Sequence, residues 1–105
     1  METRILGTTE ADIRLAAEMI QKGGLVAFPT ETVYGLGADA LNAEAVGKVY
    51  AAKGRPSDNP MIVHIAQKSD MNKLTDGITP EVERLMEAFW PGPLTMVVPA
   101  KDVIP

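Results

Sequence analysis

Hydrophobic positions repeat at helical spacing in three segments of the chain. In the first, Thr9 begins a capping-box pattern with Asp12, and apolar residues then recur every three or four positions until Gly23 and Gly24. A threonine cap, an apolar stripe and terminal glycines are typical of an amphipathic helix, since the hydroxyl satisfies a free backbone N–H and glycine tolerates the left-handed backbone that ends a helix. The stripe consists of Ile13, Ala16, Ala17 and Ile20.

Two further helices are predicted by the same signals. Asn42 caps a segment that ends near Lys53 and Gly54, and Thr79 with Pro80 begins the other helix. Asparagine and threonine are favoured caps, and proline fits the first helical position because its missing N–H has no partner there. The two apolar stripes are Ala45, Val46, Val49 and Tyr50, then Val82, Leu85, Met86 and Phe89.

Apolar runs of strand length predict β-strands. Residues 25–28 are bounded by glycine and proline and suit a strand buried on both faces. Residues 61–65 predict a second buried strand, interrupted by the polar His64, and residues 94–98 predict a third strand. Residues 3–6 suit a further short strand, whereas residues 29–41 have no sustained period and predict a surface loop. Strands that alternate with helices favour an α/β layer architecture.

Composition and charge narrow the class of protein. The 105 residues suit one domain, 1–105, and 46% hydrophobic with 23% charged residues predicts a packed core. A net charge of −4 argues against attraction of the whole surface to nucleic acid or anionic lipid. The absence of cysteine excludes disulfides, thiolate nucleophiles and cysteine-ligated zinc. Without a signal-peptide core or an apolar membrane span, a cytoplasmic location is expected.

The strongest chemical constellation is the run Lys-Gly-Arg-Pro-Ser-Asp-Asn-Pro at residues 53–60. It places two cations, a hydroxyl and an amide on one short loop stiffened by proline, which suits a polyphosphate. The alternative is structural, because Lys53 and Arg55 would also answer the negative end of the preceding helix dipole. The Walker pattern is missing, so a nucleotide would need another framework.

A second group of polar side chains directly follows the predicted strand 25–28. Thr30, Thr32 and Tyr34 supply two hydroxyls and a phenol, which suit a small polar molecule such as an amino acid. The alternative is an ordinary turn whose threonines satisfy nearby backbone groups. His64 also has two interpretations, because a lone histidine in an apolar strand is more often structural than catalytic, and one histidine makes no transition-metal site.

Together these segments resemble the YrdC/Sua5 family. The resemblance rests on Phe-Pro-Thr-Glu-Thr-Val-Tyr-Gly-Leu-Gly at 28–37, Lys-Gly-Arg-Pro at 53–56, Asn-Pro at 59–60 and Ile-Val-His-Ile at 62–65. Phe-Trp-Pro-Gly-Pro-Leu-Thr at 89–95 extends it. It covers nearly the whole chain, and the joint occurrence of spaced motifs is far more specific than any one of them.

The resemblance implies an α/β fold, a YrdC-like twisted sheet with flanking helices around a large concave cavity. There L-threonine would be carbamoylated with bicarbonate, and the carbamate would attack the α-phosphate of ATP, releasing pyrophosphate, with Mg²⁺ assisting. The threonylcarbamoyl-AMP would pass to the tRNA threonylcarbamoyl transferase complex for N6-threonylcarbamoyladenosine modification. Direct binding of tRNA stays open, and no membrane partner is expected.

The resemblance also implies roles for individual residues. Lys53 and Arg55 would contact the phosphates and act in catalysis. The nucleotide side of the pocket would be completed by Ser57 and Asn59. The threonine side would be formed by Thr30 and His64, with Thr32 and Tyr34 as further members. No metal-ligating protein residue is predicted.

One departure from the family pattern concerns completeness. The family's phosphate site includes a Ser-x-Asn element farther along the chain, and nothing after Trp90 contains it. We therefore expect residues 1–105 to be the N-terminal portion of an incomplete domain, inactive by itself. Two alternatives are a carbamoyltransferase-maturation-type domain, which lacks the Lys-Gly-Arg-Pro continuation, and an RNA-binding module, which the negative charge and few aromatic residues do not favour.

Overall fold

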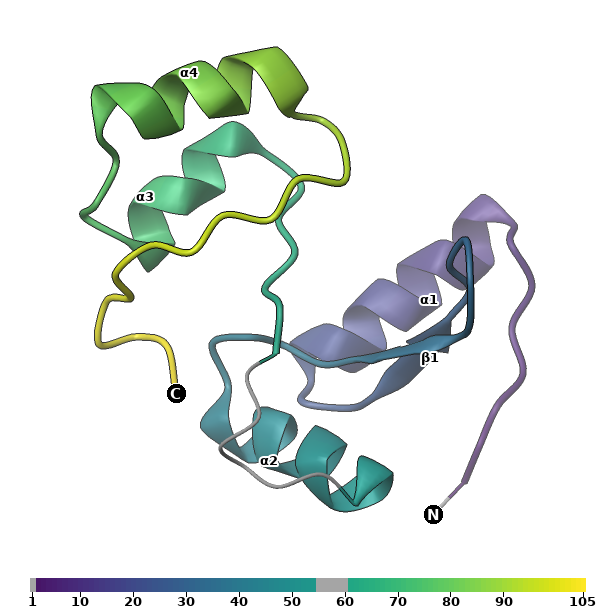
Figure 1. Ribbon diagram of the computed structural model, residues 1–105. Helices are drawn as coiled ribbons and strands as arrows, with labels where there is room; N and C mark the ends of the chain where they lie inside the picture. Colours follow the sequence, from purple (N-terminus) through teal and green to yellow (C-terminus); the bar gives the residue numbers. More distant parts are fainter. Residues whose placement is uncertain (1, 55–60) are drawn as a thin grey trace. The chain divides into compact units, whose positions relative to one another are not determined.

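The computed structural model describes residues 2–54 and 61–105 (Figure 1). The chain divides into two compact units, Met1–Asn59 and Pro60–Pro105. Each unit has its own small set of helices and its own buried residues. The first unit contains most of the predicted site residues, and the second contains His64.

The first helix begins and ends where the sequence predicts. α1 spans Glu10–Gln21, and the Thr9 hydroxyl accepts a hydrogen bond of 3.2 Å from the backbone N–H of Asp12. The Asp12 carboxylate accepts from the backbone N–H of Gly7 at 2.7 Å, so the reciprocal half of the predicted capping box is made with a different residue. After the helix, Gly23 has a φ of 88°, a left-handed conformation that favours glycine.

A β-hairpin follows α1. β1, Val26–Phe28, pairs antiparallel with β2, Gly35–Gly37, so that Phe28 lies opposite Gly35. A Cβ added at either Gly35 or Gly37 would lie 2.9 Å from the Phe28 ring, so glycine at both positions leaves room for that ring. β1 was predicted, but β2 lies inside the predicted loop 29–41, because Gly-Leu-Gly has no strand propensity and pairing with β1 decides its conformation.

The second helix supplies the buried core of the first unit. α2 spans Ala43–Lys53, and the Asn42 side chain accepts from the backbone N–H of Ala45 at 3.1 Å, as predicted. Ala45 and Val49 on this helix are 1% and 2% exposed. The helix ends at Gly54, which has a φ of 65°. This left-handed turn directs the chain out of α2 at the start of the basic motif.

The described residues of the second unit form a 3₁₀ helix and two α-helices. A 3₁₀ helix, η1 (Lys68–Asp70), leads into α3 (Met71–Leu74), and α4 spans Pro80–Phe89. The cap of α4 is confirmed, since the Thr79 hydroxyl accepts from the backbone N–H of Val82 at 3.3 Å. η1 and α3 were not predicted, because a single helical turn has no apolar repeat to detect. The buried residues are Met71, Thr75 and Met86.

The C-terminal segment is attached to the end of α3 by Lys101. Its backbone N–H donates to the carbonyl of Leu74 at 2.8 Å, and its Nζ donates to the carbonyl of Asn72 at 2.6 Å. The same ammonium forms an ion pair with Asp76 at 3.3 Å. These contacts satisfy two carbonyl groups at the end of a helix, where intrahelical partners are missing.

Three predicted strands are absent from the described residues. Residues 3–6, 61–65 and 94–98 belong to no sheet there, although residues 94–98 alternate between half-buried and exposed side chains as a strand would. The predicted burial of β1 on both faces is also wrong, since Phe28 is 37% exposed. A strand requires a neighbouring strand for its backbone hydrogen bonds, and the local sequence cannot supply one.

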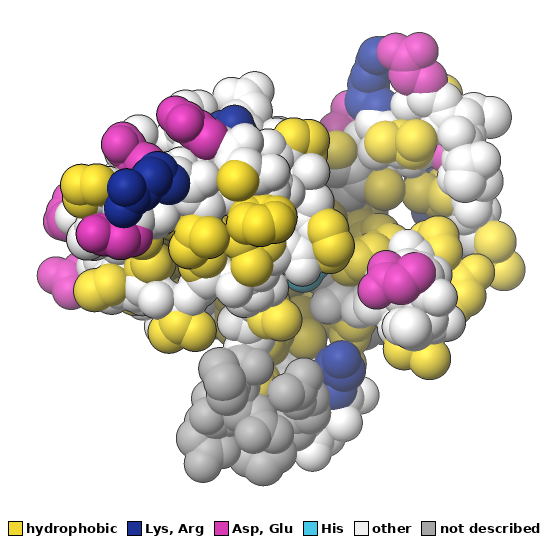
Figure 2. Space-filling model, turned by 45° about the horizontal axis from the view of Figure 1, so that its top comes forward, with side chains coloured by type: hydrophobic (Ala, Val, Ile, Leu, Met, Phe, Trp, Pro, Cys, Tyr) yellow, Lys and Arg dark blue, Asp and Glu magenta, His cyan; other side chains and the backbone are white. Residues whose placement is uncertain are grey.

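Large hydrophobic side chains are correspondingly exposed. Figure 2 shows many of them on the visible face, interspersed with charged residues. Ile5 and Val97 are 97% and 99% exposed, and Ile62 in the second unit is 61% exposed. Scattered exposed apolar residues are normal, but here they greatly outnumber the buried ones, so the two cores are small.

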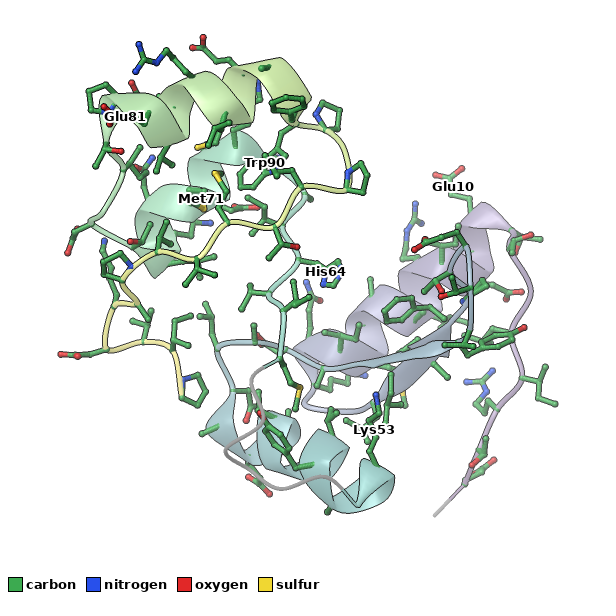
Figure 3. All side chains as sticks on the ribbon, in the orientation of Figure 1. Glu10, Lys53, His64, Met71, Glu81 and Trp90 are labelled. Atoms are coloured by element: carbon green, nitrogen blue, oxygen red, sulfur yellow. The ribbon has the colours of Figure 1, made fainter. Side chains whose placement is uncertain are left out.

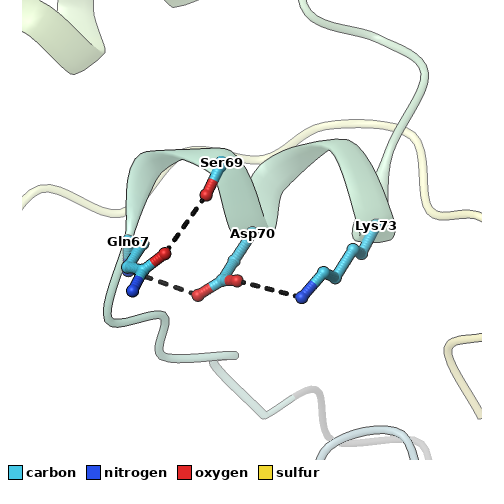
Figure 4. Close-up of polar contacts among 4 residues, drawn as sticks. All are labelled: Gln67, Ser69, Asp70 and Lys73. Atoms are coloured by element: carbon cyan, nitrogen blue, oxygen red, sulfur yellow. Dashed lines mark hydrogen bonds and ion pairs between the residues drawn. The ribbon is translucent and has the colours of Figure 1, made fainter.

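The start of η1 contains a polar cluster (Figure 4). The backbone N–H of Gln67 donates to the Asp70 carboxylate at 3.2 Å, and Lys73 lies 3.4 Å from its other oxygen. The Ser69 hydroxyl donates to the Gln67 side chain at 3.4 Å. The hydrogen bond from Gln67 is the main cause that lowers the pKa of Asp70 below its ordinary value of 3.8, and Lys73 adds to it.

This order of causes predicts the effect of removing the lysine. In Lys73→Met the pKa of Asp70 should stay below its ordinary value, because the backbone donor of Gln67 remains. Since the pKa of Asp70 is lower in the folded state, its ionised carboxylate stabilises the fold at pH values above the unfolded-state pKa. This stabilisation is lost as the pH falls through the folded-state pKa. An NMR titration of the ¹³C-labelled carboxylate measures this, and a return to the ordinary pKa in Lys73→Met would contradict it.

Candidate functional site

The predicted threonine-binding residues lie on the loop that joins β1 to β2. Because Phe28 pairs with Gly35, residues 29–34 form the connection of the hairpin, and both of its ends are fixed by the strand pair. The loop is exposed throughout, and the side chains of Val33 and Tyr34 are 75% and 74% exposed. Tyr34 is therefore no core aromatic in this structure, and its ring is accessible to a ligand.

The hydroxyl of Thr30 organises this loop. It donates to the backbone carbonyl of Val33 and accepts from the backbone N–H of Thr32 at 3.2 Å. The hydroxyl oxygens of Thr30 and Thr32 are 3.4 Å apart. The structure thus brings Thr30 and Thr32 together in a turn, in which the Thr30 hydroxyl satisfies nearby backbone groups. The sequence offered a turn whose threonines satisfy nearby backbone groups as one of two interpretations, while the part played by Val33 was missed.

Lys53 projects from the last turn of α2 (Figure 3). Its side chain is exposed, and within residues 2–54 and 61–105 no carboxylate lies within ion-pair distance of its ammonium. This position beside the negative end of α2 fits the helix-dipole interpretation, and an exposed ammonium without an acidic partner also suits an anionic ligand. Arg55, Ser57 and Asn59 lie outside the described residues.

His64 belongs to the second unit, and its imidazole is exposed (Figure 3). Its Nδ1 lies 3.2 Å from the backbone carbonyl of Ile62, two residues earlier. A contact with a carbonyl favours the tautomer in which Nδ1 is protonated, and it leaves Nε2 as an acceptor. The structural interpretation of the sequence placed His64 in a buried strand, with its ring hydrogen-bonded there. The exposed position of the imidazole differs from that interpretation.

Among residues 2–54 and 61–105, no group of three or more histidine, aspartate or glutamate side chains could hold a metal ion. In the same residues, every helix is too short or too polar to cross a membrane.

The model of the Sua5/YciO/YrdC family, described as telomere recombination, matches residues 18–105. That match includes the hairpin loop, the basic motif and the segment around His64.

Two relatives named threonylcarbamoyl-AMP synthase resemble most of the chain. The protein of Pyrococcus abyssi is 55% identical over 96 residues, which are 91% of this chain and 28% of that protein. The protein of Bacillus subtilis is 53% identical over 96 residues, again 91% of this chain and 28% of the relative. The chain thus spans less than a third of the length of either relative.

Two solved structures also match nearly all of this chain, which covers less than a third of each of them. The crystal structure of P. abyssi Sua5 complexed with L-threonine matches with a TM-score of 0.86 and 53% identity, over 98% of this chain and 29% of that one. A structure of a variant of P. abyssi Sua5 gives a TM-score of 0.87 at 55% identity, over 92% and 30%. The predicted α/β fold class is confirmed by these structures, of which the chain matches one part.

Proposed function

Because the chain belongs to the Sua5/YciO/YrdC family, we propose that it forms the N-terminal portion of a threonylcarbamoyl-AMP synthase domain. The observation that carries the proposal is its likeness, across nearly all of its length, to relatives named for this activity and to a Sua5 structure that holds L-threonine. The completed enzyme would use L-threonine, bicarbonate and ATP, and its product would serve the threonylcarbamoylation of tRNA.

The proposed reaction has two steps. The amine of L-threonine adds to bicarbonate with loss of water, which gives a carbamate. A carbamate oxygen then attacks the α-phosphorus of ATP, so that a new P–O bond forms while the bond to the β-phosphate breaks and pyrophosphate leaves. Alignment of the attacking oxygen with the leaving group, and neutralisation of charge on the phosphoryl oxygens, are the main tasks of the protein.

The basic motif is suited to the second task. The ammonium of Lys53 would neutralise charge on the phosphates, and the guanidinium of Arg55 would hold two phosphate oxygens at once. The nucleotide side would be completed by Ser57 and Asn59. A Mg²⁺ ion would add Lewis-acid charge neutralisation, and it would enter with ATP, since the described residues offer no cluster of ligands for it.

The hairpin loop and His64 are suited to the amino-acid substrate. The Thr32 hydroxyl and the Tyr34 phenol are exposed polar groups on a loop fixed at both ends. The Nε2 atom of His64 would add an acceptor for a hydroxyl or ammonium group.

A hybrid enzyme tests the proposal directly. The 96 matching residues of this chain would replace their counterparts in the P. abyssi relative. We expect this hybrid enzyme to release pyrophosphate only when L-threonine, bicarbonate and ATP are all present, with threonylcarbamoyl-AMP identified by mass spectrometry. The unaltered P. abyssi protein is the positive control. A folded hybrid enzyme that forms no product would refute the proposed function.

In the hybrid enzyme, His64→Ala should raise the KM for L-threonine about tenfold and leave the KM for ATP nearly unchanged. Loss of a hydrogen bond to a charged group has about this effect on affinity, and it appears for the contacted substrate alone. Steady-state titration of each substrate measures both constants. Glu87→Ala, an exposed change on α4, is the control, and an equal rise in both KM values would contradict the assignment.

A further inference from the structure

We propose that Thr30 is a positioning residue, which holds the loop so that Thr32 and Tyr34 meet the substrate, and that it does not itself contact threonine. This inference rests on the proposed function, because it assigns parts within the same amino-acid site. It revises the role that the family resemblance suggested for Thr30.

The Thr30 hydroxyl has almost no hydrogen-bonding capacity left for a substrate. A threonine hydroxyl has one donor hydrogen and two acceptor lone pairs. The Thr30 hydrogen is used by the carbonyl of Val33, and one lone pair is used by the backbone N–H of Thr32. The remaining lone pair faces the Thr32 hydroxyl at 3.4 Å. A bound substrate would have to displace one of these partners.

The hydrogen bonds of Thr30 also determine whether Thr32 offers a donor or an acceptor. Since the Thr30 hydrogen points to the Val33 carbonyl, the bond between the two hydroxyls has Thr32 as its donor. The lone pairs of the Thr32 oxygen then remain for a ligand. Thr32 therefore presents an acceptor, which fits the amino or hydroxyl hydrogens of an amino acid rather than its carboxylate.

The same hydrogen bonds hold the neighbouring side chains of the loop toward solvent. The strand pair fixes the ends of the loop at Phe28 and Gly35, and the bonds of Thr30 fix its middle. With the Val33 carbonyl turned to Thr30, the side chains of Val33 and Tyr34 are about three-quarters exposed. The loop is thus ordered before a ligand arrives, which lowers the entropy cost of binding.

Two variants of the hybrid enzyme separate positioning from contact. Thr30→Val keeps the side-chain shape and removes the hydroxyl, whereas Thr30→Ser keeps the hydroxyl. Without threonine, rapid-quench hydrogen exchange should show faster exchange of the Thr32 amide in Thr30→Val and unchanged exchange in Thr30→Ser. With substrates, Thr30→Val should raise the KM for L-threonine by about three- to tenfold at unchanged kcat, and Thr30→Ser should stay within about twofold of the parent. Glu87→Ala, the exposed change on α4, is again the control.

The outcomes distinguish this inference from the proposed function. A higher KM in Thr30→Val with unchanged exchange in the free protein would make Thr30 a direct contact and overturn the inference. Faster exchange with an unchanged KM would also overturn it, because the loop order would then have no part in binding. If the parent hybrid enzyme makes no product, the proposed function fails, and the exchange experiment still decides whether Thr30 orders the loop.

Discussion

Lys53→Ala and Arg55→Ala should each lower kcat/KM for pyrophosphate release by the hybrid enzyme about 100-fold or more. Groups that stabilise charge developing in a transition state have effects of roughly this size. Lys53 is exposed and has no carboxylate within ion-pair distance in residues 2–54 and 61–105, so its ammonium is accessible to phosphate oxygens. Each variant is assayed by pyrophosphate release under saturating L-threonine and bicarbonate.

The helix-dipole interpretation makes a different prediction, and a matched variant tests it. Lys22 is also exposed and lies at the C-terminal end of a helix, α1, so Lys22→Ala removes the same charge from an equivalent position. Either change should lower the free energy of unfolding by at most about 1 kcal/mol. If Lys53→Ala lowers the melting temperature strongly while activity per folded molecule is unchanged, the residue is structural and the phosphate role is refuted.

The 105-residue chain by itself is expected to form no threonylcarbamoyl-AMP and to self-associate. Each unit has few buried residues, while Ile62 and Val97 of the second unit are largely exposed. Small cores leave little stability, and exposed apolar segments with strand propensity associate with one another. The relatives named threonylcarbamoyl-AMP synthase contain more than three times as many residues as this chain.

Sedimentation velocity at several concentrations, combined with the product assay, tests this expectation. Val97→Lys should reduce association, because a charge on an unpaired apolar segment opposes pairing between chains. Glu87→Gln changes the net charge in the same direction on exposed α4 and serves as the control. A monodisperse monomer that makes product would show that these 105 residues form the catalytic unit, contrary to the proposal.

The sequence determined the three long helices, because their signals are local. The caps Thr9, Asn42 and Thr79 each accept from a backbone N–H three residues later, and the apolar stripes repeat within a few turns. Gly54 likewise marks the end of α2 through its own backbone conformation. Such interactions join neighbours in sequence, so they can be recognised without knowledge of the rest of the fold.

The strands could not be determined in this way, because their hydrogen bonds join distant residues. β2 forms from an unpromising Gly-Leu-Gly because β1 lies beside it and the Phe28 ring occupies the space above Gly35 and Gly37. Residues 61–65 and 94–98 have stronger strand propensity, but the described residues give them no partner. Whether each segment formed a strand thus depended on whether the fold placed another strand beside it.

The candidate site divides in the same way. The sequence alone identified the family motifs and the residue types suited to phosphates and to an amino acid. It could not predict the partners of the Thr30 hydroxyl, which forms hydrogen bonds with the backbone of its own loop. Nor could it predict that Tyr34 and His64 are exposed. The sequence specifies the chemical groups of each side chain. Which groups its donors and acceptors bind depends on the surrounding backbone, and that backbone is determined only by the tertiary structure.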